Sequence, residues 1–169
     1  MSRYIVNELK TGEMKKVLLV DKNKNVKSGL KKIVDSIPDH EVEETLSSID
    51  ELKTKTLSNN DIVLFELMDE NLDVIKKMSR SIRYTSAKFV GMKSIENPDL
   101  EKRAFLSGLN GIIDKSSSAE KFKEMFNAVN SKGFYFSREI LQSITEEYTE
   151  KSTQSSLKQK VYNAINFFK

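Results

Sequence analysis

The sequence contains no cysteine among its 169 residues. Disulfide bonds, thiol nucleophiles and cysteine-based zinc or iron–sulfur sites are therefore excluded. No run approaches the ~18 consecutive apolar residues of a membrane span. The N-terminal segment 1–10 is polar and lacks the apolar stretch of a signal peptide. These absences predict a cytoplasmic protein with no membrane partner.

Histidine occurs only once, as His40 after Pro38 and Asp39. A metal site or an acid–base centre needs several partners, so we interpret His40 as a solvated side chain in a turn. The 28 basic and 25 acidic residues leave a net charge of +3, which is not the electrostatic signature of a nucleic-acid-binding protein. The length and the 38% hydrophobic content suit one folded domain with a modest appendage.

Three short apolar runs each end on charged residues. They are Val17–Val20 before Asp21, Ile62–Phe65 before Glu66, and Ile112-Ile113 before Asp114-Lys115. Continuous Val/Ile/Leu runs are typical of parallel strands, which are buried on both faces. Since the ligand crevice of an open α/β sheet lies beyond the carboxyl ends of its strands, the charged residues form a candidate site.

Apolar stretches with strand and helix patterns alternate along the chain. We expect strands at 17–20, 41–45, 62–67, 88–92 and 112–113, with 41–45 at an edge. The expected helices are 26–34, a short one near 49–52, 72–82, one on Leu100, Ala104 and Leu106, and one from the N-cap Ser118 to Gly133. This alternation predicts an α/β fold, a doubly wound five-stranded parallel sheet.

The chain is predicted to have three parts: a polar leader at 1–14, the α/β body at 15–136 and a two-helix extension at 137–169. The first helix of the extension has an apolar stripe at Ile140, Leu141, Ile144 and Tyr148, and the second has one at Leu157, Val161, Ile165 and Phe168. The second stripe needs a partner surface. Docking on the chain's own body and formation of a homodimer are both open.

With the strands placed, several ordered motifs carry a family resemblance: 17–22 (VLLVDK), 61–68 (DIVLFELM), Gly108 with 111–116 (GIIDKS), and 133–137 (GFYFS). Their order resembles the receiver domain of bacterial response regulators, and the last motif is similar to the LuxR-type branch. The resemblance covers about 15–137. It implies the flavodoxin-like receiver fold and a role in two-component signalling or transcription regulation.

The family's phosphorylation site is not retained. The resemblance implies two acids that hold magnesium, a phosphoacceptor aspartate, a Thr or Ser, a lysine, and an aromatic switch residue. In that order, the corresponding residues are Asp21 and Lys22, Glu66, Lys93, Lys115 and Ile112. The first five carry two carboxylates and three ammonium groups, a net charge of +1 where the family pocket has −2.

A pocket with this charge should bind magnesium poorly, and glutamate displaces its carboxylate from the geometry of phosphoryl transfer. Glu66 either imitates a phosphorylated aspartate, with Lys115 and Lys93 paired to its carboxylate, or forms a salt bridge that fills a vacated site, with Lys115 as its partner. We favour the salt bridge, because a partly buried carboxylate needs a cation. The prediction is a phosphorylation-independent pseudo-receiver with no catalytic residue, metal or cofactor.

Three other hypotheses have less support. An enzyme would need a site, but no glycine-rich phosphate loop occurs and the pairs Glu43-Glu44 and Glu146-Glu147 point apart. A flavodoxin would need a Ser/Thr/Gly-rich turn after the first strand, and this chain has none there. A truncated LuxR-type DNA-binding regulator is the main alternative, and DNA would then be a partner only through a further output domain. We therefore expect a protein partner, including a second copy of the chain.

Overall fold

The computed structural model describes residues 13–54, 57, 61–82 and 87–151, with side chains omitted at 53–54, 76–82 and 148–151. Its strands are β1 (Lys15–Val20), β2 (His40–Leu46), β3 (Asp61–Glu66), β4 (Lys88–Lys93) and β5 (Gly111–Asp114). Its helices are α1 (Lys24–Asp35), the 3-10 helix η1 (Ile49–Thr54), α2 (Asp69–Ile82), α3 (Pro98–Leu106), α4 (Ala119–Lys132) and α5 (Arg138–Lys151).

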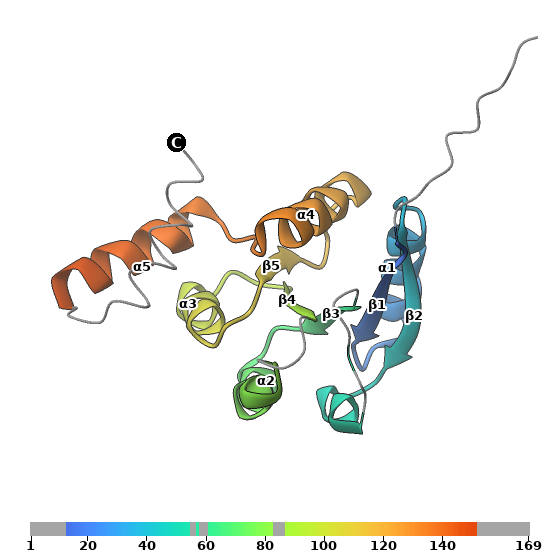
Figure 1. Ribbon diagram of the computed structural model, residues 1–169, viewed down its shortest axis with the longest axis horizontal. Helices are drawn as coiled ribbons and strands as arrows, with labels where there is room; N and C mark the ends of the chain where they lie inside the picture. Colours follow the sequence, from blue (N-terminus) through green and yellow to red (C-terminus); the bar gives the residue numbers. More distant parts are fainter. Residues whose placement is uncertain (1–12, 55–56, 58–60, 83–86, 152–169) are drawn as a thin grey trace, which may run out of the picture.

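The strands form one parallel sheet in the order β2-β1-β3-β4-β5, with β2 and β5 at the edges (Figure 1). The predicted five-stranded α/β fold is therefore confirmed, including β2 as an edge strand. None of the described helices has the length and hydropathy needed to cross a membrane.

Helices cover both faces of the sheet (Figure 1). Val17, Leu19, Ile62 and Leu64 pack with α1 and α4 on one face. Leu18, Val20, Val63 and Phe65 pack with η1, α2 and α3 on the other. Because successive side chains of a strand point to opposite faces, the apolar runs seen in the sequence fill two cores at once.

The segment after α4 closes the exposed edge of β5. Gly133, in the left-handed conformation at φ 86°, ends α4. Ile112 N then donates to the carbonyl of Tyr135 at 3.0 Å, and Tyr135 N donates to Asn110 O at 2.7 Å. A Cβ at position 111 would lie 2.8 Å from Tyr135 O, so glycine permits this close pairing.

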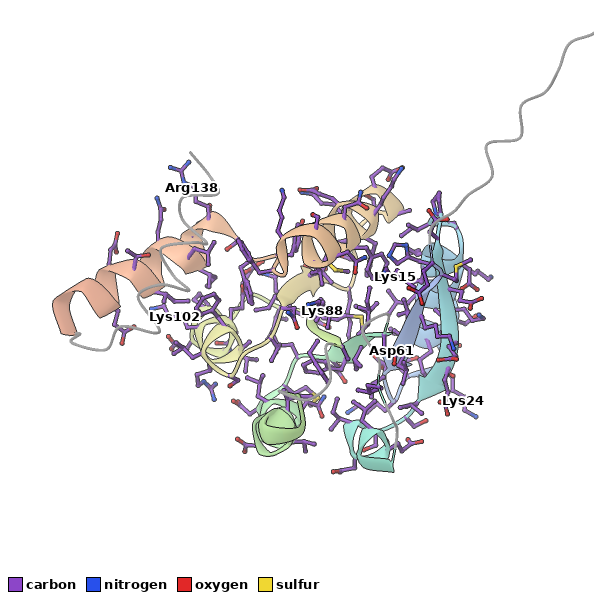
Figure 2. All side chains as sticks on the ribbon, in the orientation of Figure 1. Lys15, Lys24, Asp61, Lys88, Lys102 and Arg138 are labelled. Carbon is purple, nitrogen blue, oxygen red and sulfur yellow. The ribbon has the colours of Figure 1, made fainter. Side chains whose placement is uncertain are left out.

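This pairing directs α5 onto α3. Ile140, Leu141 and Ile144 are buried in the same cluster as Leu100 and Phe105. Lys102 of α3, which is labelled in Figure 2, also pairs with Glu147 of α5 at 3.8 Å. The first helix of the predicted extension therefore packs on the body of the protein. The side chain of Tyr148, the leader 1–12 and the second stripe at Leu157, Val161, Ile165 and Phe168 lie outside what the structure describes.

Two predictions about single residues are wrong. Leu106 is 42% exposed, and Phe105 packs in the core in its place, where it meets Phe136 edge to face at 5.1 Å. His40 is buried rather than solvated, because Asp39 adopts a positive φ of 62° and β2 begins at His40 itself. Its ring stacks on Phe126 of α4 at 4.5 Å.

The surroundings of the buried His40 ring favour its neutral form. Its Nδ1 lies 2.9 Å from Pro38 O, which can only accept, so Nδ1 carries the proton. Nε2 faces the amide nitrogen of Asn130 at 3.4 Å. Burial, with a smaller contribution from the charge of Lys15, lowers the pKa of His40 below its ordinary 6.5 against the opposing effects of Pro38 and Asp39.

Because the pKa of His40 is lowered in the folded protein, the free energy of unfolding should depend on pH. A histidine with a lowered folded-state pKa stabilises the protein above its unfolded pKa, and this contribution is lost as the pH falls. We expect the free energy of unfolding in urea to decrease between about pH 7 and pH 5. Since the chain has no other histidine, His40→Phe should remove most of this slope. An unchanged slope in the variant would contradict the assignment.

Candidate functional site

The charged residues predicted at the strand ends do meet at one rim of the sheet. Asp21 follows β1, Glu66 ends β3 and Lys115 follows β5. Since side chains alternate along a strand, these three positions continue the series Leu19, Leu64 and Ile113, all of which face α1 and α4. Strand periodicity thus brings them to the same side of the rim.

Lys115 bridges the two carboxylates. Its Nζ lies 2.7 Å from Asp21 Oδ2 and 2.8 Å from Glu66 Oε1. The side chains are 14% exposed at Lys115, 1% at Asp21 and 24% at Glu66. The predicted salt bridge between Glu66 and Lys115 is therefore present, and Asp21 is a second acceptor that the salt-bridge hypothesis did not include.

The geometry of this cluster also explains what the second oxygen of Asp21 binds and why Lys115 is charged. Asp21 Oδ1 accepts from the backbone N–H of Asn23 at 2.8 Å, so both oxygens of Asp21 are engaged. Burial alone would lower the pKa of Lys115, but the hydrogen bonds and charges of Asp21 and Glu66 outweigh it and raise the pKa above 10.5. Lys115 is a stable cation at neutral pH.

Lys93 belongs to a different cluster, so the suggestion that it pairs with Glu66 is wrong. Its Nζ lies 2.6 Å from Glu96 Oε2 and 3.0 Å from Glu101 Oε1. Lys93 has the same strand parity as Phe89, which packs on the face with α3. The alternation of β4 therefore sends Lys93 toward α3 and away from the cluster around Lys115.

The carboxylate of Glu101 is nearly enclosed, with 6% of its side chain exposed. Burial lowers the pKa of Lys93, but hydrogen bonds to Glu96 and Glu101 and their charges raise it more. Sequence reasoning missed both glutamates. The available signal was the position of Glu101 between Leu100 and Ala104 in the buried stripe of α3.

Two predicted site residues, Lys22 and Ile112, lie outside both ion-pair clusters, and one buried lysine was not predicted. Lys22 is exposed and belongs to neither cluster. Ile112 is 7% exposed and lies in the apolar cluster that includes α3 and α5. Lys27 was also missed: it is buried, and its Nζ contacts Leu46 O at 3.2 Å and Ser47 Oγ at 3.0 Å.

Comparison with protein-family models gave no match, and comparison with curated protein sequences gave none either. Solved structures do match. A LuxR-family two-component response regulator from Aurantimonas sp. SI85-9A1 superposes with a TM-score of 0.65 at 19% identity, covering 80% of this chain and 98% of that one.

Two further structures show the same likeness. The isolated receiver domain of RcsB from Salmonella enterica serovar Typhimurium, solved with BeF3−, gives a TM-score of 0.61 at 17% identity, over 78% of this chain and 98% of that one. A LuxR-family DNA-binding response regulator from Silicibacter pomeroyi gives 0.59 at 17%, over 75% and 99%. The likeness establishes that this chain has the receiver fold.

The receiver fold implies a magnesium ion held by carboxylates, and the residues present do not fit one. Both oxygens of Asp21 are engaged, Glu66 shares the ammonium of Lys115, and Lys22 stands where a second acid would add charge. A hard dication needs several free oxygen ligands. Among the residues that the structure describes, no three His, Cys, Asp or Glu side chains are grouped for a metal ion.

Removing the central cation should destabilise the fold. Lys115→Met leaves Asp21 and Glu66 without their shared partner, and breaking such a buried pair costs about 3–5 kcal/mol. The triple variant Lys115→Met, Asp21→Asn, Glu66→Gln should recover part of this loss, because no buried charge is left unpaired. Urea unfolding measures both.

Lys16→Met provides the control, since its pair with Glu43 is 45% and 44% exposed. Such surface pairs contribute little, so stability should barely change. An equally small loss for Lys115→Met would contradict a structural role for the bridge.

Proposed function

We propose that this chain is a pseudo-receiver, a regulatory protein of signalling or transcription whose state is not set by phosphorylation. The observation that carries the proposal is the ammonium of Lys115 bound to Asp21 and Glu66 together. A phosphorylatable site needs acids to hold a metal and a lysine to meet the phosphoryl group. Here the acids and the lysine satisfy one another.

The identity of the acceptor supports the same proposal. Glu66 is one methylene longer than aspartate, and phosphoryl transfer depends on in-line positioning of the attacking oxygen. Asn71 Nδ2 also donates to the backbone carbonyl of Glu66 at 2.6 Å, which fixes the end of β3 against the start of α2. The longer side chain therefore projects from a fixed backbone and cannot retreat to the position of an aspartate.

A receiver without phosphate chemistry acts by binding. We propose that its partner is another protein, with a second copy of the chain among the candidates. The apolar stripe at Leu157, Val161, Ile165 and Phe168 is the proposed contact, because a helical apolar face requires a partner surface. The spacing of these four residues in the sequence is the only basis for proposing the stripe as a contact.

A second candidate rests on the solved structures. One of the similar proteins is described as a LuxR-family DNA-binding response regulator. On this hypothesis, the present chain is the receiver part of such a regulator and DNA is contacted only by a further output domain. Salt-dependent binding of this chain itself to duplex DNA would favour direct binding over both proposals.

Incubation with acetyl phosphate and Mg²⁺ tests the central proposal. We expect no acyl phosphate on Glu66, measured by intact mass and by hydroxylamine release. The variant Lys22→Asp, Glu66→Asp supplies a second acid beside Asp21 and the shorter acceptor, and should gain magnesium-dependent labelling. A stable, magnesium-dependent acyl phosphate on Glu66 of the unaltered chain would overturn the proposal.

Light scattering of the full chain tests the proposed contact. Val161→Asp together with Ile165→Asp places charge on the apolar stripe, so a dimer should dissociate to a monomer. Gln159→Asp lies on the opposite side of the same predicted helix and should leave the mass unchanged. If the unaltered chain is a monomer at every concentration, the stripe does not mediate dimerisation.

A further inference from the structure

The two edge strands of the sheet differ in how their outward backbone groups are satisfied. At β2, side chains of α1 cap Val42: its N–H donates to Asp35 Oδ1 at 2.9 Å and its carbonyl accepts from Lys31 Nζ at 3.3 Å. Lys31 and Asp35 also pair with each other at 2.8 Å. Free edge groups invite pairing with another chain, and charged side chains over an edge prevent it. The edge of β2 is thus closed at Val42.

The edge of β5, between α3 and α4 (Figure 1), is closed along only part of its length. Tyr135 fills the first place beside it through two hydrogen bonds. A parallel strand would continue with bonds from Ser137 N to Ile112 O and from Asp114 N to Ser137 O. Neither bond forms, because Ser137 instead caps α5, where its hydroxyl accepts from Ile140 N at 3.3 Å.

This open end of the β5 edge presents one acceptor and one donor. Lys115 N donates to Lys93 O of β4 at 2.8 Å, and since the backbone alternates, Ile112 and Asp114 face outward. Ile112 O and Asp114 N have no partner among the described residues, whereas Asp114 O accepts from Ser117 N at 3.1 Å. An acceptor and a donor two residues apart are the pair that a single residue of a parallel strand satisfies.

Ile112 and Asp114 both line a groove with a volume of about 610 Å³. Most of its other lining comes from α4 and from the segment 134–139. The charged lining is balanced, with four basic and four acidic side chains. A nucleic acid would require an excess of basic groups, so the groove favours an uncharged peptide.

Strand parity also indicates which side chain the groove accepts. Tyr135 pairs with Gly111 and packs against the apolar cluster that includes α4. A residue that satisfies both free groups lies opposite Ile113, which faces the same cluster. Its side chain therefore points toward α4, where Tyr135 and Ala128 line the groove. An apolar, β-branched residue fits this place in a strand.

We propose that the open end of the β5 edge binds an extended, uncharged peptide segment of a partner protein as an added parallel strand. The N–H of its central, apolar residue donates to Ile112 O, and the carbonyl of that residue accepts from Asp114 N. Main-chain hydrogen bonds supply affinity in such complexes, and alternate side chains supply specificity. The inference rests on the proposed function, in which the chain acts by binding, and adds a surface separate from the apolar stripe.

Disulfide tethering to the full chain tests this surface, because the sequence contains no cysteine. Asn127→Cys places a thiol on the exposed side of α4 beside the groove. A capped peptide of sequence Cys-Gly-Thr-Val-Thr, held there by a disulfide, reaches a millimolar effective concentration. Compared with the same variant carrying a small thiol cap, the Asp114 amide should exchange its hydrogen about tenfold or more slowly by NMR. The Val42 amide, which Asp35 already holds, should keep its rate.

Two controls separate strand addition from simple crowding. A peptide with N-methylvaline lacks the N–H that Ile112 O would accept, so it should give little protection. The valine peptide tethered through Glu41→Cys lies at the opposite edge of the sheet and should leave the Asp114 amide unchanged.

An unchanged Asp114 exchange rate with the valine peptide on Asn127→Cys would overturn the proposal. Equal protection from the N-methylvaline peptide, or from the peptide at position 41, would overturn it as well. None of these outcomes involves a phosphoryl donor or the apolar stripe, so the labelling and light-scattering experiments decide the proposed function separately.

Discussion

The ion bridge from Lys115 to Asp21 and Glu66 is the interaction on which the site depends. It joins residues 94 and 49 positions apart in the chain. In the sheet order, β5 is separated from β3 by β4, and β1 lies beyond β3. A lysine can cross this distance because its ammonium is carried on a flexible four-carbon stem. The bridge therefore ties three strand ends together and uses the acids that a metal would need.

Strand periodicity divides the rim into two sides. Asp21, Glu66 and Lys115 share the parity of side chains that face α1 and α4, whereas Lys93 shares the parity of those that face α3. The substitution of lysine at position 93 thus places a cation where it organises α3 through Glu101. The receiver fold is kept, while Asp21, Glu66, Lys93 and Lys115 at its rim each belong to an ion pair.

Much of this arrangement is predictable from sequence because it follows from local patterns. Apolar runs ending at Asp21 and Glu66 locate the strands and bring their charges to one rim, and Ser118 caps α4 as expected by accepting from Lys121 N. Other features depend on tertiary contacts. The partners of Lys93 come from a helix, the burial of His40 depends on the φ of Asp39, and the docking of α5 depends on the pairing of Tyr135 with β5. A pattern identifies an apolar stripe but not the surface that receives it.

The most direct test of the account is whether magnesium competes with Lys115. A Mg²⁺ titration followed by the carboxyl-carbon NMR signals of Asp21 and Glu66 measures this at the atoms concerned. If the ammonium satisfies both carboxylates, their signals should stay in place at millimolar Mg²⁺, apart from the small uniform changes of ionic strength that exposed carboxylates such as Glu43 also show. A saturable shift confined to Asp21 and Glu66 would contradict the account.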